Sequence, residues 1–85
     1  MPEQKPSLGR IVFFHPGNSV DKQLPNGMEA APAIITQVFS DTMVNLSLFL
    51  ASPGGEPVRQ EWSVSHKDAE YLIEGSHYWD WPPRV

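Results

Sequence analysis

Aromatic and basic side chains gather near the C-terminal end of the chain, where they could bind a small planar molecule. Trp79 and Trp81 are two positions apart, His77 precedes them and Arg84 follows. Because side chains along an extended strand alternate between its faces, both indoles are expected on one face. Aromatic rings stack on bases, and the arginine guanidinium pairs with phosphate through two parallel hydrogen bonds. These groups together suit a mononucleotide, a dinucleotide or a cyclic nucleotide.

The segment 16–32 is the second candidate contributor to such a site. A connection of this length is more often functional or disordered than neutral. Asn18 and Asn26 can hold backbone N–H groups toward an anion, but Lys22 is the only basic residue of the segment. Arginines from elsewhere must therefore neutralise any phosphate, unless the segment is only a solvated insertion. The candidate ligand-binding residues are Arg10, Phe14, His15, Asn18, Asn26, Arg59, His77, Trp79 and Arg84.

Patterns typical of enzymes and metal sites are weak in this chain, which has no cysteine. The two serine–histidine pairs, at 65–66 and 76–77, each consist of adjacent residues. A strand would point such neighbours to opposite faces, where they cannot act as nucleophile and base. His66, Asp68 and Glu70 are ligand types that zinc or manganese accepts, but the two acids equally suit the first turn of a short helix. We therefore expect no catalytic residue, no metal site and no cofactor.

Length and composition restrict the fold and the compartment. The chain has 85 residues, of which 40% are hydrophobic and 19% are charged, as in one small globular domain. The net charge is −4 and the basic residues are scattered, which argues against binding to duplex nucleic acid. No apolar stretch approaches the roughly 20 residues of a membrane-spanning helix. The lack of cysteine and of a signal-peptide pattern at the start favours the cytoplasm.

Turn residues divide the chain into short β-strands. Strands are expected at 10–15, 33–39, 43–50, 58–65 and 76–81. The alternation of apolar and polar residues over 43–50 is the clearest strand pattern in the sequence. In the strand 58–65, the same alternation predicts that Trp62 and Val64 both point inward.

The predicted fold is all-β: a small antiparallel barrel or strongly curved sheet of four to six strands. It has at most one short helical turn, for which 66–75 is the candidate; the alternative there is a loop. Residues 1–8 are expected to form a flexible N-terminal arm. Residues 9–85 are expected to form a single β-barrel domain with a long loop at 16–32.

One face of the expected sheet keeps apolar residues that the core does not use. Phe13 and Phe14 are neighbours on one strand, so one of them points away from the core. Met43 and Phe49 lie on the face opposite the leucines of the 43–50 strand. An apolar second face usually meets a partner. We therefore predict a homodimer or higher oligomer with Phe14, Met43 and Phe49 at its interface.

Several motifs occur together in a fixed order along the chain. They are Gly9-Arg10-Ile11-Val12, Ala33-Ile34-Ile35-Thr36-Gln37-Val38, Val44-Asn45-Leu46 and Tyr78-Trp79-Asp80-Trp81-Pro82-Pro83-Arg84-Val85. The chain resembles a group of small phage- and prophage-encoded proteins whose members carry GRIV, AAIVT.V, VNL.VF and W.WP..V in this order. The resemblance spans most of the chain, although segment 16–32 is longer here. It implies a barrel of the SH3-like kind and a phage origin, without an enzymatic activity or functional residues to transfer.

These observations lead to one expected function and one alternative. We expect a non-enzymatic phage accessory protein of the host cell cytoplasm that counteracts a host process, as anti-defence proteins do. It would sequester either a small nucleotide-type signal, such as a cyclic nucleotide, or a host protein. The alternative is a structural or assembly protein of the virion that packs through its sheet face.

Overall fold

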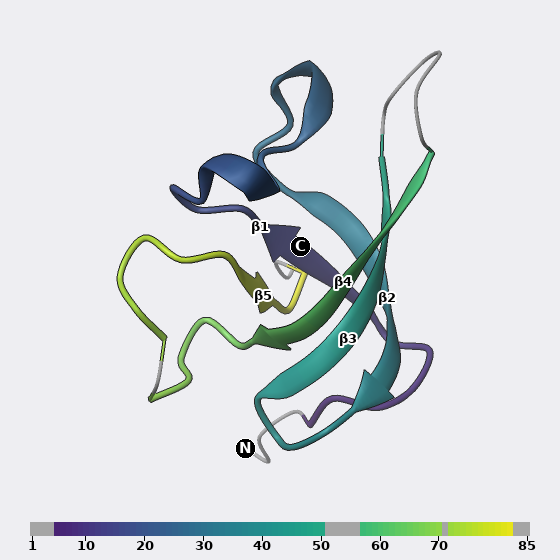
Figure 1. Ribbon diagram of the computed structural model, residues 1–85. Coiled ribbons are helices and arrows are strands. Elements are labelled where there is room, and N and C mark those ends of the chain that lie inside the picture. The colour runs from purple at the N-terminus through teal and green to yellow at the C-terminus, as the bar shows by residue number, and fades with distance from the viewer. Residues whose placement is uncertain (1–4, 51–56, 71, 83–85) are drawn as a thin grey trace.

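The computed structural model describes residues 5–50, 57–70 and 72–82, and these form one antiparallel sheet of five strands (Figure 1). The strands are β1 (Ile11–His15), β2 (Ala31–Val38), β3 (Met43–Phe49), β4 (Val58–Ser65) and β5 (Tyr78–Asp80). Their order in the sheet is β4-β3-β2-β1-β5. The predicted all-β fold with a strongly curved sheet is confirmed.

The sheet curls into a half-barrel whose two edge strands approach each other (Figure 1). His66, just after β4, forms a parallel bridge with Trp79 of β5. The backbone N–H of Lys67 donates to the carbonyl of Trp79 at 3.0 Å, and that of His66 donates to Thr42 at 2.7 Å. The inside of the curl holds the core, in which Phe14, Leu46 and Trp79 are among the largest fully buried side chains.

Two bulges, one on each side of β3, bend the sheet. In β4 the residues Trp62 and Ser63 together oppose the single residue Asn45, because Val64 pairs with Val44 and Glu61 pairs with Leu46. The register of β2 against β3 also shifts, between Ile35 and Gln37. An extra residue bends a strand and increases its twist. The curl therefore originates on both sides of Asn45.

The bulge in β4 makes one sequence prediction wrong. Trp62 was expected to point inward with Val64, but its residue surface is 67% exposed. With two residues opposite Asn45, the alternation shifts by one, and Glu61 and Val64 become the buried residues of this strand. Ser63 adopts a φ of 53°, in the left-handed region that non-glycine residues rarely occupy.

The connections are more ordered than the sequence suggests. Within the expected loop 16–32, two short 3-10 helices form at Val20–Lys22 and Pro25–Gly27, and β2 already begins at Ala31. In the described part of 66–75 there is a bridge at His66 and turns, without a helix. Of the expected N-terminal arm, residues 5–8 are described, and Pro6 among them is buried.

Candidate functional site

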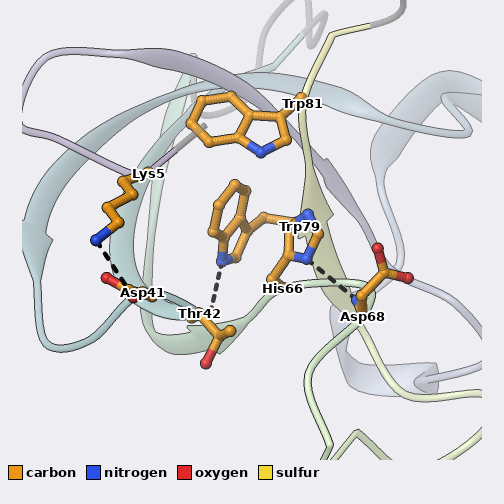
Figure 2. A pocket seen from close by; sticks show the side chains of 7 residues that line it. All are labelled: Lys5, Asp41, Thr42, His66, Asp68, Trp79 and Trp81. Carbon is orange, nitrogen blue, oxygen red and sulfur yellow. Dashed lines mark hydrogen bonds and ion pairs between the residues drawn. The ribbon is translucent and has the colours of Figure 1, made fainter. Parts of the chain in front are cut away.

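A cleft of about 390 Å³ opens beside β5, where the curled sheet closes (Figure 2). Separate parts of the chain supply its lining residues: Lys5, Asp41, Thr42, His66, Asp68, Trp79 and Trp81. In Figure 2 the indole of Trp79 stands in the middle of these side chains, with the ring of Trp81 above it and His66 at its side. This volume lies within the range of small-molecule pockets, roughly 300–1,000 Å³.

Trp79 forms the fixed wall of the cleft, and Trp81 forms the wall that a ligand can reach. Trp79 is 1% exposed, and its Nε1–H donates a hydrogen bond of 3.0 Å to the carbonyl oxygen of Thr42. The two indoles meet edge to face, with an interplanar angle of 84° and centroids 5.2 Å apart. Trp81 is half-buried and packs against the core. The two indoles that the sequence assigned to one face do contact each other.

His66 is held in one orientation at the side of the cleft. Its Nδ1 accepts a hydrogen bond of 3.1 Å from the backbone N–H of Asp68, so the neutral ring carries its proton on Nε2. That Nε2 lies 3.3 Å from Oδ1 of Asp80, and the ring contacts Trp79 at a centroid distance of 4.5 Å. The imidazole therefore presents a fixed edge to the cleft.

The charges around the cleft are mixed. Nζ of Lys5 lies 4.0 Å from Oδ2 of Asp41, and both side chains are largely exposed. Asp68 adds a second carboxylate to the lining. With one lysine against two acids, the cleft repels a ligand that carries several phosphates. A ring with at most one negative charge fits this lining better.

Of the two predicted arginines that the structure describes, Arg10 is the one that lies beside this cleft. Its Cζ lies 5.2 Å from the centre of the Trp81 ring, in a cation–π arrangement. Arg10 is exposed, so its guanidinium can still reach a ligand in solvent. Of the nine candidate ligand-binding residues, the structure places Arg10 and Trp79 at this cleft, one beside Trp81 and the other in its wall.

Arg59 does not join the cleft, because it holds the long loop onto the sheet. Its NH1 and NH2 groups donate to the carbonyls of Gln23 and Lys22, at 3.2 and 3.1 Å. Its Nε lies 2.9 Å from Oε2 of Glu61, whose Oε1 accepts from Nζ of Lys22 at 2.8 Å. Glu61 is only 4% exposed. All three guanidinium nitrogens of Arg59 therefore serve the fold, which leaves this residue poorly placed to bind phosphate.

Phe14 is also removed from the candidate residues, both for ligand binding and for the oligomer interface. Its side chain is fully buried in the core, beneath Arg59, whose Cζ lies 5.8 Å from the ring centre. The alternation of β1 places Val12 and Phe14 inward. It is Phe13, which is half-buried, that shares the outward side with Ile11.

Of the remaining candidates, His15 lies at a second hollow of about 430 Å³, which it lines together with Tyr78. Their rings stack with centroids 4.8 Å apart. Burial lowers the pKa of His15, an effect that Asp80 opposes and Lys67 reinforces. His77 contacts the buried Phe14 ring at 5.8 Å.

Asn18 uses its backbone N–H inside the protein, where it donates to the carbonyl of Gly75 at 2.7 Å. The loop therefore packs against 75–76 rather than presenting this group to an anion. Gly17 enforces the close approach: its φ is 59°, and an added Cβ would lie 2.5 Å from the carbonyl oxygen of Ser76. Arg84 and the side chain of Asn26 lie outside the described residues.

Of the residues that line the cleft, Trp79 was predicted to bind a ligand, whereas Trp81 and five others were not. Two of them, His66 and Asp68, had been noticed as possible metal ligands by their spacing. The contribution of Thr42 is a backbone carbonyl, which no side-chain pattern can reveal. Lys5 and Asp41 reach the cleft only because the sheet closes there.

Within the ranges that the structure describes, no group of three or more His, Asp or Glu side chains is placed to hold a metal ion. Among the same residues, no helix has the length and apolar character needed to cross a membrane. Comparison of the chain with protein-family models, curated proteins and solved structures gives no match.

Proposed function

We propose that this protein is a non-enzymatic phage accessory protein that binds a small nucleotide-type ligand in the cleft between Trp81 and His66. The observation that carries the proposal is the edge-to-face pair of Trp79 and Trp81, which opens onto a cleft of about 390 Å³. Because Trp79 is anchored to Thr42, the wall of this cleft is formed before a ligand arrives. A preformed aromatic wall reduces the entropy cost of holding a planar ring.

The charges of the lining narrow the class of ligand. Among the described residues, Lys5 is the only lysine or arginine that lines the cleft, and Asp41 and Asp68 oppose it. Arg10, whose guanidinium lies over the Trp81 ring, can add one more positive charge. This balance favours a nucleoside, a mononucleotide or a cyclic mononucleotide over a ligand with several phosphates. The ring would pack on the indole of Trp81, which the buried Trp79 supports from behind, and a single phosphate would lie toward Lys5 or Arg10.

The biological side of the proposal draws on the resemblance to small phage-encoded proteins. A protein that holds a nucleotide without converting it lowers the free concentration of that nucleotide in the host cell. Such sequestration would counteract a host process that uses the nucleotide as a signal. If the chain instead bound a host protein through the outward side of its sheet, it would lower the free concentration of that protein in the same way.

A second candidate function is an assembly role in the virion. The observation that favours it is the outward side of the sheet, which carries exposed apolar residues such as Phe49 and Trp62. Subunits of a particle pack through large, permanent contacts, and such contacts are more apolar than transient ones. An assembly protein would co-sediment with phage particles, whereas a sequestering protein would remain in the soluble fraction of infected cells.

The ligand proposal is tested by thermal shift with purified protein. The panel comprises nucleosides, mononucleotides, cyclic mononucleotides, cyclic dinucleotides and cyclic ADP-ribose. A ligand at about 100 times its Kd adds about 2.7 kcal/mol of stability, which raises the Tm of so small a domain by roughly 11–22 °C. We expect this shift with a nucleoside or with a ligand that has one phosphate, and a much smaller one with cyclic dinucleotides.

Two variants locate the binding site. Trp81→Leu retains an apolar side chain but removes the indole, and it should abolish the shift while the cooperative melt persists. Ile73→Ser, at a residue that is 75% exposed and does not line the cleft, should bind as the parent does. A panel without any shift, or a shift that Trp81→Leu leaves intact, would contradict the proposal.

A further inference from the structure

The outward side of β1–β4 carries no aspartate, glutamate, lysine or arginine, whereas Asp80 of the edge strand β5 pairs with the outward-facing Phe13. Arg59 and Glu61 are the charged residues of β1–β4, and both are turned to the inner side, where they meet Lys22 and the loop. Cross-strand pairing places Ile11 opposite Ile34, Ile34 opposite Ser47, and Ser47 opposite Gln60, so one uncharged row crosses all four strands. We call the outward-pointing residues of β1–β4 the outer face.

Large apolar side chains stand exposed on this outer face. Trp62 is 67% exposed, Ile11 46%, Phe49 42% and Val58 41%. Phe49 and Val58 are directly paired across β3 and β4, so their side chains are neighbours. Trp62 lies on the same face as Val58, with the polar Gln60 between them along β4. Single exposed apolar residues are common, but several large ones on one face favour an interaction surface.

The exposure of Trp62 results from a specific local structure. Ser63 occupies the left-handed region, and its backbone N–H donates a hydrogen bond of 2.8 Å to Oδ1 of Asn45. Asn45 is itself 5% exposed, and its Nδ2 lies 3.4 Å from Oε1 of Gln37. Without the bulge, regular alternation would turn Trp62 inward with Val64. A strained residue and a buried amide thus direct the largest side chain of β4 outward, as bulges beside functional surfaces do.

The absence of charge indicates which partner covers the outer face. Contacts with a different protein that forms and dissociates usually carry charged residues, which steer association and select the partner. Permanent contacts between identical subunits are more apolar. The chain has a net charge of −4, so two copies repel each other generally. The outer face is where two copies can meet while their charged groups stay apart.

We propose that the outer face binds a second copy of this chain, in a two-fold symmetric homodimer anchored on Trp62. In such a dimer each Trp62 packs on the apolar residues of the other copy, for which Phe49 and Val58 are the candidates. Symmetry requires the same patch on both subunits, and an uncharged patch is complementary to itself. The proposal depends neither on the ligand of the Trp81 cleft nor on a phage origin.

The mass of the full-length protein in solution tests the dimer. Light scattering coupled to size exclusion at tens of micromolar should give twice the monomer mass of 9.5 kDa. A monomeric mass would overturn the proposal and leave the outer face to another protein. A mass above that of a dimer would overturn the two-fold arrangement in favour of a ring.

Substitutions at exposed positions identify the interface. Trp62→Ser and Phe49→Lys should each weaken dimerisation at least tenfold, giving monomers with a cooperative melt, because neither side chain belongs to the core. Val20→Ser, at an 88% exposed residue of the first 3-10 helix, should remain a dimer. A dimer that survives both Trp62→Ser and Phe49→Lys would show that a different surface joins the copies. These masses are measured without any nucleotide, so their outcome is separate from that of the ligand screen.

Discussion

The side-chain oxygen of Asn45 accepts a 2.8 Å hydrogen bond from the backbone N–H of Ser63, and this contact joins β3 to the bulge of β4. It stabilises the bulge at which Ser63 adopts a φ of 53°. On the core side of the bulge lies Glu61, and on the outer face lies Trp62. One amide thus sets the position of the buried ion cluster and of the proposed dimer anchor.

Replacement of this amide should destabilise the protein. Asn45→Ala removes the acceptor and leaves the N–H of Ser63 without its partner, which costs about 1–3 kcal/mol. The free energy of unfolding from urea denaturation, at a concentration where the chain is monomeric, measures the effect. Ser47→Ala is the matched control, because Ser47 lies on the same strand face and its hydrogen bond to Gln60 is exposed. An equal loss in both variants would contradict a special role for Asn45.

Replacement of the buried carboxylate of Glu61 should destabilise the protein about as much as replacement of Asn45. It lies 2.8 Å from Nζ of Lys22 and 2.9 Å from Nε of Arg59. Glu61→Gln keeps the shape but leaves two cations without their counter-charge, and we expect a loss of about 2–3 kcal/mol because the cations keep some solvent. The free energy of unfolding from urea denaturation measures this loss. Asp41→Asn, which breaks the exposed pair with Lys5, should change stability little, and a larger loss there than in Glu61→Gln would refute this ranking.

Regular alternation made much of the fold predictable from the sequence. In the strand Met43–Phe49, Val44, Leu46 and Leu48 alternate with residues of the other face, and the structure has this strand between β2 and β4 of a curled sheet. The alternation near the C-terminal end placed Trp79 and Trp81 on one face, and their indoles contact each other. Both predictions rest on local rules, which hold wherever the strand has no extra residue.

The errors arise where one residue breaks the alternation or where distant segments meet. Trp62 was misplaced because the bulge at Ser63 depends on a contact with Asn45 in another strand. Arg59 was assigned to a ligand, since nothing in the sequence reveals that its guanidinium holds the carbonyls of Lys22 and Gln23. The cleft was only half anticipated, because one of its anchors is the backbone carbonyl of Thr42.

The lowered pKa of His15 gives a stability that depends on pH. Burial disfavours the charged imidazole, so the folded protein binds this proton less readily than the unfolded chain, whose pKa is 6.5. His15 therefore does not destabilise the fold above pH 6.5, and stability should fall as the pH drops below 6.5 toward the lowered pKa. Urea denaturation at pH 7.5 and 5.5 should show this loss, and it should be smaller in His15→Gln.

A titration of the His15 ring protons by NMR checks the cause directly. The midpoint should lie below 6.5. A midpoint at 6.5 would mean that the attraction of Asp80 balances burial, and a midpoint above 6.5 would mean that it outweighs burial. The sign of the pH dependence would then reverse, because the folded state would hold the proton more tightly than the unfolded chain.

The buried Trp79 and the exposed Trp62 should differ strongly in how much their replacement by alanine destabilises the protein. Trp79 is 1% exposed, with its N–H bound to Thr42, so Trp79→Ala should cost about 3–5 kcal/mol. A domain of this size has about that much stability in total, and the cooperative melt should therefore be lost. Trp62 is 67% exposed, and Trp62→Ala should cost less than about 1 kcal/mol where the chain is monomeric. If both variants unfold alike, Trp62 contributes to the core, and the bulge at Ser63 does not turn it outward in solution. A folded Trp79→Ala variant with a melt near the parent's would instead show that β5 is dispensable for closing the half-barrel.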